Sequence, residues 1–274
     1  MFDQVAKLGA ASQMLNDIIQ VTKQVAEHEI VPRYLRVAHE HKVDGSLCTV
    51  ADTEAQAALV KGLREIADYP VLGEEMTSEE QQRLWQAGRD GIWVIDPIDG
   101  TSNFVNGLPY FAVSIGLMRA GRAEVGVIYA PELDEVFWAE RGKGAFLNGE
   151  RLPIKERPPR NLKAAMAGVD LKRLDKKLAA ELAARPPYSS QRNFGSSALD
   201  WCFVAAGRFD VYLHGGQKLW DYAAGALILE EAGGALATLE QDDFWGSDPW
   251  KRSVVAAWHG PTFALWRDWV RTPR

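Results

Sequence analysis

The sequence has few cysteines, no long apolar run and no excess of positive charge. Its two cysteines, Cys48 and Cys202, do not make a disulfide framework. No apolar run approaches the ~20 residues that a membrane-spanning helix needs. The formal net charge of −6 lacks the basic footprint of a general nucleic-acid binder. The first residues show no basic segment followed by a short apolar core, so we expect no secretory signal and a cytoplasmic location.

Length and composition are those of a globular protein with a substantial core. Hydrophobic residues make up 47% of the chain and charged residues 25%, which is an ordinary balance. A chain of 274 residues can form one domain or two closely packed halves. The turn-rich and proline-rich segment 151–162 is the best candidate for a boundary. It predicts an N-terminal α+β half, residues 1–150, and a C-terminal α/β half, residues 151–274.

Hydrophobic periodicity predicts a mixed α/β fold. Apolar residues follow a helical spacing over 2–29, and further helices are expected over 53–67 and after Ser78. Strand-like segments at 112–117, 124–129 and 135–139 are separated by turn residues, as in a meander. The second half alternates expected helices over 171–184, 198–206, 221–232 and 262–270 with expected strands over 209–213, 234–239 and 253–258.

The most informative segment is Asp96-Pro97-Ile98-Asp99-Gly100-Thr101-Ser102, which follows the apolar run 92–95. That run predicts a buried strand, so two carboxylates emerge where the strand ends and a tight turn begins. Pro97 fixes a backbone angle between them, and Gly100 permits an unusual one after them. The N–H groups of residues 100–102 are then free to bind an anion. Two oxygen ligands beside an anion site suit a divalent cation that holds a phosphate.

Two other interpretations of this segment are a simple turn and the motif of phosphatases that form a covalent aspartyl-phosphate. Aspartate followed by glycine is common in turns, and Asp96 to Gly100 taken alone fits such a turn. The second class of phosphatase uses Asp-x-Asp-Gly-Thr, in which one aspartate is the nucleophile and the other the general acid. Here Asp99 follows Asp96 by three residues, which turns its side chain in a different direction. We therefore discount a covalent aspartyl-phosphate mechanism.

Two further segments contribute carboxylates. Gly73-Glu74-Glu75 ends a short strand-like segment, and Trp220-Asp221 opens an apolar stretch that runs to Gly234. Asp221 falls in the first turn of that expected helix, where the helix dipole favours a negative charge. Each segment fits a simpler role when taken alone: Asp221 as a helix cap, and the two glutamates as part of a solvated loop.

Together these motifs resemble the inositol monophosphatase family of Mg²⁺-dependent, Li⁺-sensitive phosphatases. The family signatures Gly-Glu-Glu, Asp-Pro-Ile/Leu-Asp-Gly-Thr-x-Asn-Phe and Trp-Asp-x-Ala-Ala/Gly-Gly occur here in the same order at 73–75, 96–104 and 220–225. The similarity extends to Lys42-Val43-Asp44-Gly45-Ser46 with Thr49 and Asp52, and to Gly195-Ser196-Ser197-Ala198. It implies the αβαβα layered sandwich shared with fructose-1,6-bisphosphatase, with the active site between the two halves.

The resemblance implies two or three Mg²⁺ ions per site, the third and weakest near Glu74. The first ion would be held by Glu74, Asp96 and the carbonyl of Ile98. The second would be held by Asp96, Asp99 and Asp221, so that Asp96 bridges the two ions. Most of these ligands come from the first half of the chain, and the second half completes the site. Lithium sensitivity follows from the same resemblance, with Li⁺ in the weaker metal position.

The resemblance also implies catalytic and substrate-binding roles. Thr101 and Asp52 would together orient and deprotonate the attacking water, since a hydroxyl needs a partner that accepts its proton. Glu75 would orient water bound to the metal without contacting the metal itself. The residues implied to bind substrate are Gly100, Thr101, Ser102, Gly195, Ser196, Ser197, His214 and Asp221.

One departure from the family pattern concerns the substrate. Inositol-cleaving members have a glutamate six residues before the tryptophan of the last motif, where it accepts hydrogen bonds from ring hydroxyls. His214 stands at this position, and an imidazole offers one acceptor where a carboxylate offers two oxygens. We therefore expect weaker handling of inositol 1-phosphate than by a relative with glutamate. The alternative is that the loop turns differently and exposes His214. Gln217 and Lys218 are candidates for polar or cationic contacts instead.

Two classes of function follow. The first is a Mg²⁺-dependent phosphomonoesterase that resembles inositol-1-monophosphatase and uses metal-activated water on a small phosphorylated metabolite. Histidinol phosphate, 3′-phosphoadenosine 5′-phosphate and fructose bisphosphate are the alternative substrates within the superfamily. The second is a regulatory interaction protein that retains the fold. The intact set Glu74, Asp96, Asp99, Thr101 and Asp221 favours the enzyme. We expect a homodimer, with neither a membrane nor general nucleic acid as a partner.

Overall fold

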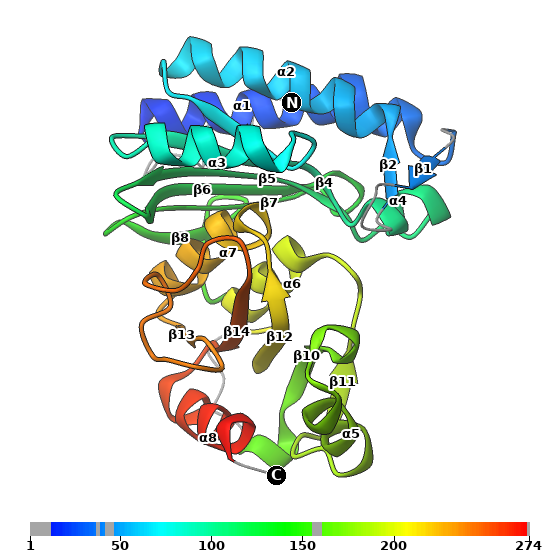
Figure 1. The fold of residues 1–274 in the computed structure, drawn as a ribbon, viewed down its shortest axis with the longest axis vertical. Coiled ribbons are helices and arrows are strands. Elements are labelled where there is room, and N and C mark those ends of the chain that lie inside the picture. Colours follow the sequence, from blue (N-terminus) through cyan, green and yellow to red (C-terminus); the bar gives the residue numbers. More distant parts are fainter. Residues whose placement is uncertain (1–11, 37–38, 42–46, 155–160, 273–274) are drawn as a thin grey trace.

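The computed structural model describes residues 12–36, 39–41, 47–154 and 161–272. Its helices and sheets are stacked in layers (Figure 1). The layers begin with α1 (Gln13–Val25) and α2 (Val50–Ile66) over a seven-stranded sheet, continue with α6 (Ser197–Ala205) and α7 (Leu219–Glu231) between that sheet and a five-stranded one, and end with α5 (Lys176–Ala184) and α8 (Gly260–Arg271). The expected αβαβα order is therefore confirmed.

The larger sheet has its strands in sequence order. It consists of β3 (Val71–Gly73), β4 (Ile92–Asp99), β5 (Ala112–Arg119), β6 (Arg122–Ala130), β7 (Glu135–Glu140), β8 (Gly144–Leu147) and β9 (Glu150–Arg151). Only the β3–β4 pair is parallel among these neighbours. The predicted meander is present as β5, β6 and β7. Because β3 runs parallel to β4, both strands end at the same edge, and the residues that follow them lie side by side.

The smaller sheet has the order β11-β10-β12-β14-β13. Its strands are β10 (Met166–Asp170), β11 (Ser190–Arg192), β12 (Val211–Gln217), β13 (Ala235–Ala237) and β14 (Arg252–Ala257). Strand β10 is parallel to both of its neighbours, whereas β14 is antiparallel to both of its own. The pattern of the sequence did not predict β10 or β11, and it also missed β8, β9 and the short pair β1 (His39–His41) and β2 (Leu47–Thr49).

Local capping explains where several helices begin. Helix α2 starts at Val50, before the predicted residue 53, because Thr49 and Asp52 form a reciprocal capping box. The predicted helix over 171–184 is divided into a 3₁₀ turn, Leu171–Arg173, and α5, which Asp175 caps. The remaining helical segments are α3 (Ser78–Ala87), α4 (Thr101–Asn106), the π-helical turn Ala26–Ile30 and the 3₁₀ turns Val31–Arg33, Pro131–Leu133 and Leu162–Ala164.

Some predictions fall on parts of the chain that the structure does not describe. The predicted first helix over 2–29 is seen from Gln13, with Ser12 as its cap, and its first ten positions lie outside the described residues. The motif Lys42 to Ser46 also lies outside them.

Helices α6 and α7 are apolar on nearly all sides because they lie between the two sheets. Small residues allow α7 to approach the larger sheet closely. A Cβ atom added to Gly126 on β6 would lie 2.8 Å from the carbonyl oxygen of Ala224, and one added to Gly116 on β5 would lie 3.1 Å from Cβ of Ala223. This close packing brings the first turn of α7 to the end of β4.

The tryptophans near the C-terminus serve the core. Trp266 is fully buried and stacks on Trp269, with ring centroids 5.9 Å apart, and Trp245 is also buried. No helix within the described ranges is both long enough and apolar enough to cross a membrane.

Candidate metal centre

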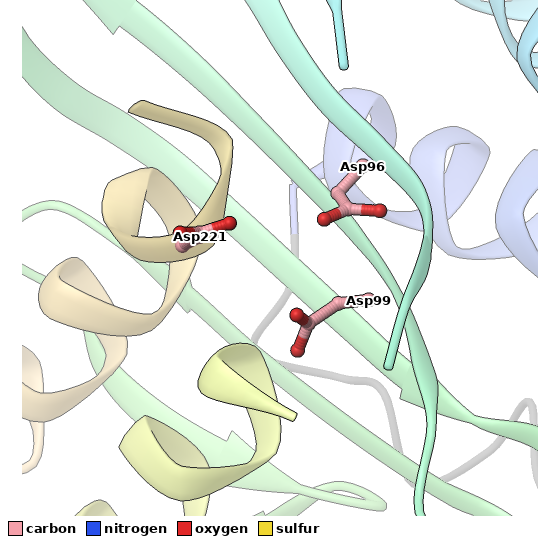
Figure 2. Close-up of side chains that lie close together, drawn as sticks. All are labelled: Asp96, Asp99 and Asp221. Carbon is pink, nitrogen blue, oxygen red and sulfur yellow. The ribbon is translucent and has the colours of Figure 1, made fainter. Parts of the chain in front are cut away.

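Three aspartates from two distant segments meet at the edge of the larger sheet. Asp96 and Asp99 come from β4, and Asp221 comes from the first turn of α7. Each offers a carboxylate oxygen that lies within 4.8 Å of the others. Figure 2 shows the three carboxylates facing the space between them. Asp96 and Asp99 are buried, and Asp221 is partly exposed.

A bulge in β4 brings Asp96 and Asp99 to the same side. Residues three apart in a regular strand point to opposite faces of the sheet. Here Asp96 pairs with Ser114 and Asp99 with Ala112, so β4 has one residue more than β5 between the two pairs. The N–H of Ile98 donates to Oδ1 of Asp96 at 3.1 Å, which holds the turned segment in place. The bulge therefore places two carboxylates that are three residues apart on the same side of β4.

Glu74 joins the cluster from the end of β3. Its carboxyl raises the pKa of Asp96 through its charge and a side-chain hydrogen bond, and it lines the same pocket as Asp99 and Asp221. Two glutamines hold its turn. Gln81 donates to the carbonyls of Gly73 and Glu74 at 2.9 and 3.2 Å, and Oε1 of Gln56 accepts from the N–H of Glu75 at 3.0 Å. Motif reasoning did not find either glutamine, because each lies on a neighbouring helix.

The buried carboxyl groups of the cluster have raised pKa values, and a bound cation would stabilise their ionised forms. Burial, followed by the charge of Glu74, raises the pKa of Asp96 well above its usual range. Burial also raises the pKa of Asp99 to about 6, although hydrogen bonds from Ser196 and Ala198 oppose the shift. Burial and the charge of Asp99 raise the pKa of Asp221. A compact set of oxygen donors that repel one another fits a hard divalent cation such as Mg²⁺.

The stability of the metal-free protein should fall as the pH rises. When folding raises the pKa of a carboxyl, the native state binds more protons than the unfolded chain. The contribution of that group to the free energy of unfolding is then fully present below its pKa in the unfolded chain, and it is lost as the pH rises past its pKa in the folded protein. For Asp99 this window runs from 3.8 to about 6. In the presence of a chelator, thermal unfolding should show Asp96→Asn more stable than the wild type at pH 8, with the difference closing toward pH 4.

Added Mg²⁺ provides the control for this measurement. It should stabilise the wild type more than the variant, because the variant lacks one of the charges that attract the ion. A difference between the two proteins that does not change with pH would contradict charge repulsion as its cause.

Asp52 and Thr101 form a pair beside the cluster. Oδ1 of Asp52 lies 3.3 Å from Oγ1 of Thr101, and that hydroxyl lies 3.1 Å from the carbonyl oxygen of Ile98. The other oxygen of Asp52 accepts from the N–H and the hydroxyl of Thr49, at 2.7 and 2.6 Å. The Asp52 carboxylate is thus fully buried and held by the start of α2, with one oxygen directed at Thr101. Thr49 is a positioning group that motif reasoning did not include among the site residues.

The segment after β4 adopts the turn that its glycine predicts. Gly100 has φ of +95° and precedes the first residue of α4, Thr101. A Cβ atom at Gly100 would lie 3.0 Å from the carbonyl oxygen of Tyr110. Nδ2 of Asn103 donates to the carbonyl oxygens of Tyr110 and Phe194, both at 2.6 Å. These contacts hold the start of α4 against the segment that contains Gly195.

The predicted substrate segment 195–197 meets β4 directly. The hydroxyl of Ser196 donates to Oδ2 of Asp99, and the N–H of Ala198 donates to the same oxygen at 2.7 Å. Ser196 is fully buried and also caps α6, so its side chain orients Asp99. Gly195, Ser197 and Ser102 line the pocket, and their contact with substrate stays a prediction.

Glu75 turns toward β2. Its Oε2 lies 3.3 Å from the thiol of Cys48, which donates to it. The predicted role of Glu75 in orienting water stays a prediction.

A pocket of about 420 Å³ connects the metal centre with the second half of the chain. Glu74, Asp99 and Asp221 line one part of it, and His214 lines another. His214 is only 6% exposed, so the alternative in which it is exposed is wrong. Its Nδ1 accepts from the N–H of Gly216 at 3.1 Å, and burial lowers its pKa to about 4. The imidazole is therefore neutral at pH 7.

Several residues that line this pocket were not found from the sequence. They are Asp170, Lys172, Arg173, Asn193 and Asp200. Asp170 ends β10, a strand that the pattern did not predict, and Lys172 and Arg173 follow it. The only available signal was a pair of basic residues after a short apolar segment, which is too common to interpret.

Comparisons with known proteins found a matching family model and similar proteins. A family model described as the inositol monophosphatase family matches residues 5–266. The Nus factor SuhB of Pseudomonas aeruginosa is 35% identical over 246 residues, 85% of this chain and 86% of that protein. The inositol-1-monophosphatase of Caulobacter vibrioides is 37% identical over 203 residues, 71% of this chain and 77% of that protein. The solved structure of the Thermotoga maritima IMPase has a TM-score of 0.80 at 30% identity, covering 95% of this chain and 97% of its own.

Proposed function

This chain belongs to the inositol monophosphatase family, and we propose that it is a Mg²⁺-dependent phosphomonoesterase acting on a small phosphorylated metabolite. The observation that carries the proposal is the convergence of Asp96, Asp99 and Asp221 beside the Asp52–Thr101 pair. A metal ligand set and a group that can orient water are both needed for direct hydrolysis of a phosphate ester. Strands and helix starts hold each residue of this set, so the fold itself fixes their arrangement.

The residues of the chain divide the work of the reaction. Glu74, Asp96, Asp99, Asp221 and the Ile98 carbonyl would hold Mg²⁺, which supplies positive charge for the phosphoryl oxygens when bound. The Thr101 hydroxyl would hold the attacking water, and Asp52 would accept the proton that passes through that hydroxyl. The free N–H groups at the start of α4 would bind phosphate oxygens. Tight packing of α7 on the larger sheet holds Asp221 close to the end of β4.

The test of the proposal is release of phosphate from p-nitrophenyl phosphate. This aryl ester needs few contacts with its alcohol, so it reports the metal centre and not the specificity of the pocket. We expect activity that requires Mg²⁺ and is abolished by a chelator. Absence of metal-dependent release at any Mg²⁺ concentration would refute the proposal.

A regulatory role is a second candidate, because relatives with 35–40% identity are named Nus factor SuhB. The two functions are separable in a cell that depends on this protein. If Asp96→Asn in the chromosome behaves like a deletion, the phosphatase carries the cellular role. If the variant supports normal growth while its activity is lost, the protein acts through an interaction with a partner.

We also propose that the protein is a homodimer, which sedimentation equilibrium would test.

Lithium should inhibit the proposed activity. Asp96, Asp99 and Asp221 are the ligands that the resemblance assigns to the second metal position, the weaker of the first two, and all three are present. We expect inhibition of p-nitrophenyl phosphate hydrolysis by Li⁺ at low Mg²⁺, measured against K⁺ at equal ionic strength. Activity that is the same in both salts would contradict the assignment of a weak second ion position.

A further inference from the structure

The pocket wall next to His214 is rich in cationic side chains. Lys172, Arg173 and Lys218 line the pocket, and all three are exposed residues. Within the described part of the chain, none of them forms an ion pair within 4.0 Å. This wall therefore has positive charges that no carboxylate of the described chain neutralises by direct contact.

The fold holds Arg173 at this wall. Asp170 at the end of β10 lies opposite His214 on β12, and the 3₁₀ turn Leu171–Arg173 follows. A Cβ atom added to Gly215 would lie 1.8 Å from the carbonyl oxygen of Arg173, so the turn packs directly on a backbone without a side chain. Oδ1 of Asp170 accepts from the N–H of Lys172 at 3.0 Å and fixes the start of the turn.

Arg173 lies in the same pocket as both His214 and the metal centre. It lines that pocket together with His214 and Asp221, and it follows closely after Asp170, the strand partner of His214. Two carboxyl groups, those of Asp170 and Asp200, line the same wall. Burial raises the pKa of Asp200 well above its usual value, which favours its neutral form. The three cations outnumber the two carboxyl groups even when both are ionised, and the imidazole is neutral, so the wall has net positive charge.

We propose that this wall binds a second anionic group on the alcohol part of the substrate, with Arg173 as the residue that determines this specificity. The proposal rests on the proposed phosphatase function and names its substrate class: phosphate monoesters that also carry a phosphate or a carboxylate. A planar guanidinium binds either group through two parallel hydrogen bonds. Oδ2 of Asp170 lies 3.7 Å from Nε2 of His214. His214 is consistent with this class, because a glutamate in its place would put a second carboxylate beside Asp170 and repel the anion.

Matched pairs of substrates test the proposal. Fructose 1,6-bisphosphate differs from fructose 1-phosphate by one phosphate, and 3-phosphoglycerate differs from glycerol 3-phosphate by a carboxylate in place of an alcohol. We expect kcat/KM to favour the member with the second anionic group in at least one pair by about tenfold or more, the gain of a charge-assisted contact. The pair that shows the larger ratio identifies the second anion as a phosphate or a carboxylate.

Substitution at Arg173 links this ratio to the residue. Arg173→Met should lower the ratio about tenfold, mainly through a higher KM for the substrate with the second anionic group. His214→Glu should also lower it, and should improve hydrolysis of inositol 1-phosphate if His214 holds the polyol position. Lys176→Met is the matched control, because Lys176 is exposed at the start of α5 and does not line the pocket.

Two results would overturn the inference. One is a ratio near one in the wild type for both pairs. The other is an equal loss by Arg173→Met for both members of each pair, which would show that Arg173 only balances the carboxylates of the metal centre. Calorimetry of the same four compounds binding to Thr101→Val in the presence of Mg²⁺ separates a failure of this inference from a failure of the proposed phosphatase function. If the variant prefers the compounds with the second anionic group but the wild type shows no turnover, the anion site is supported and the phosphatase function is refuted. If the wild type hydrolyses p-nitrophenyl phosphate but no preference is found, the phosphatase function is supported and the anion site is refuted.

Discussion

Asp96→Asn is expected to abolish nearly all hydrolysis of p-nitrophenyl phosphate while the fold stays intact. Asp96 is buried at the centre of the carboxylate cluster, with Glu74, Asp99 and Asp221 all close enough to raise its pKa. An amide has the same shape but lacks the charge needed to hold a cation between these groups. Without the metal, the transition state loses several kcal/mol of charge stabilisation, which corresponds to a fall in kcat of about a thousandfold or more.

The measurement is kcat at saturating Mg²⁺, together with calorimetric Mg²⁺ binding and circular dichroism. Asp90→Asn is a suitable control, because Asp90 is an exposed aspartate in the turn before the same strand. The control should keep wild-type turnover. Near-normal turnover by Asp96→Asn would show that Asp96 is not a metal ligand and would remove the basis of the proposed mechanism.

Thr101→Val is expected to give the second large loss. Valine keeps the size of threonine but has no hydroxyl to lie between the attacking water and Asp52. Proton transfer by a positioned group contributes roughly 10²–10⁴-fold to a rate, so kcat should fall by about that factor. The loss should be mainly in kcat, because the hydroxyl is bonded to Asp52 and not to the three clustered aspartates. Mg²⁺ affinity should change less, since the hydroxyl meets the proposed ligands through its bond to the Ile98 carbonyl.

The choice of Thr101 over Asp52 keeps this test free of folding effects. Asp52 also forms the capping box of α2 with Thr49, so a change there would weaken the helix as well. Thr53→Val is the control, since Thr53 is an exposed threonine on α2 with a hydroxyl bonded to its own helix. If Thr101→Val turned over as fast as this control, water activation would have to come from another group.

The carboxylates of the candidate metal centre could be predicted from the sequence, but their arrangement could not. The Asp96–Asp99 spacing predicts a turn as readily as a ligand pair, and only the bulge opposite Ser114 and Ala112 places both carboxylates on one side. The third aspartate, Asp221, comes from a helix that reaches β4 because glycines on β5 and β6 leave room for its backbone. Such close approach depends on residues from three elements and has no local signature.

The second half of the pocket was the least predictable part. Strand β10 consists mostly of small residues and is only five residues long, so no alternation distinguishes it from a loop. It becomes a strand because β11 and β12 pair with it on both sides. Since β10 was not predicted, neither was the position of Arg173 beside His214. The burial of His214 likewise follows from tertiary contacts, since its own strand pattern allows either face.

The sequence by itself determined the family, the layered fold class and the chemical nature of the donors, because these depend on residue types in short ordered motifs. Only the tertiary structure decided which carboxylates share one site, which oxygen of Asp52 faces Thr101 and which cations lie along the pocket. The physical reason is that a charge acts over a few ångströms of space, whereas the groups that meet here are separated by many residues along the chain. Their distances are set by the packing of α6 and α7 between the two sheets.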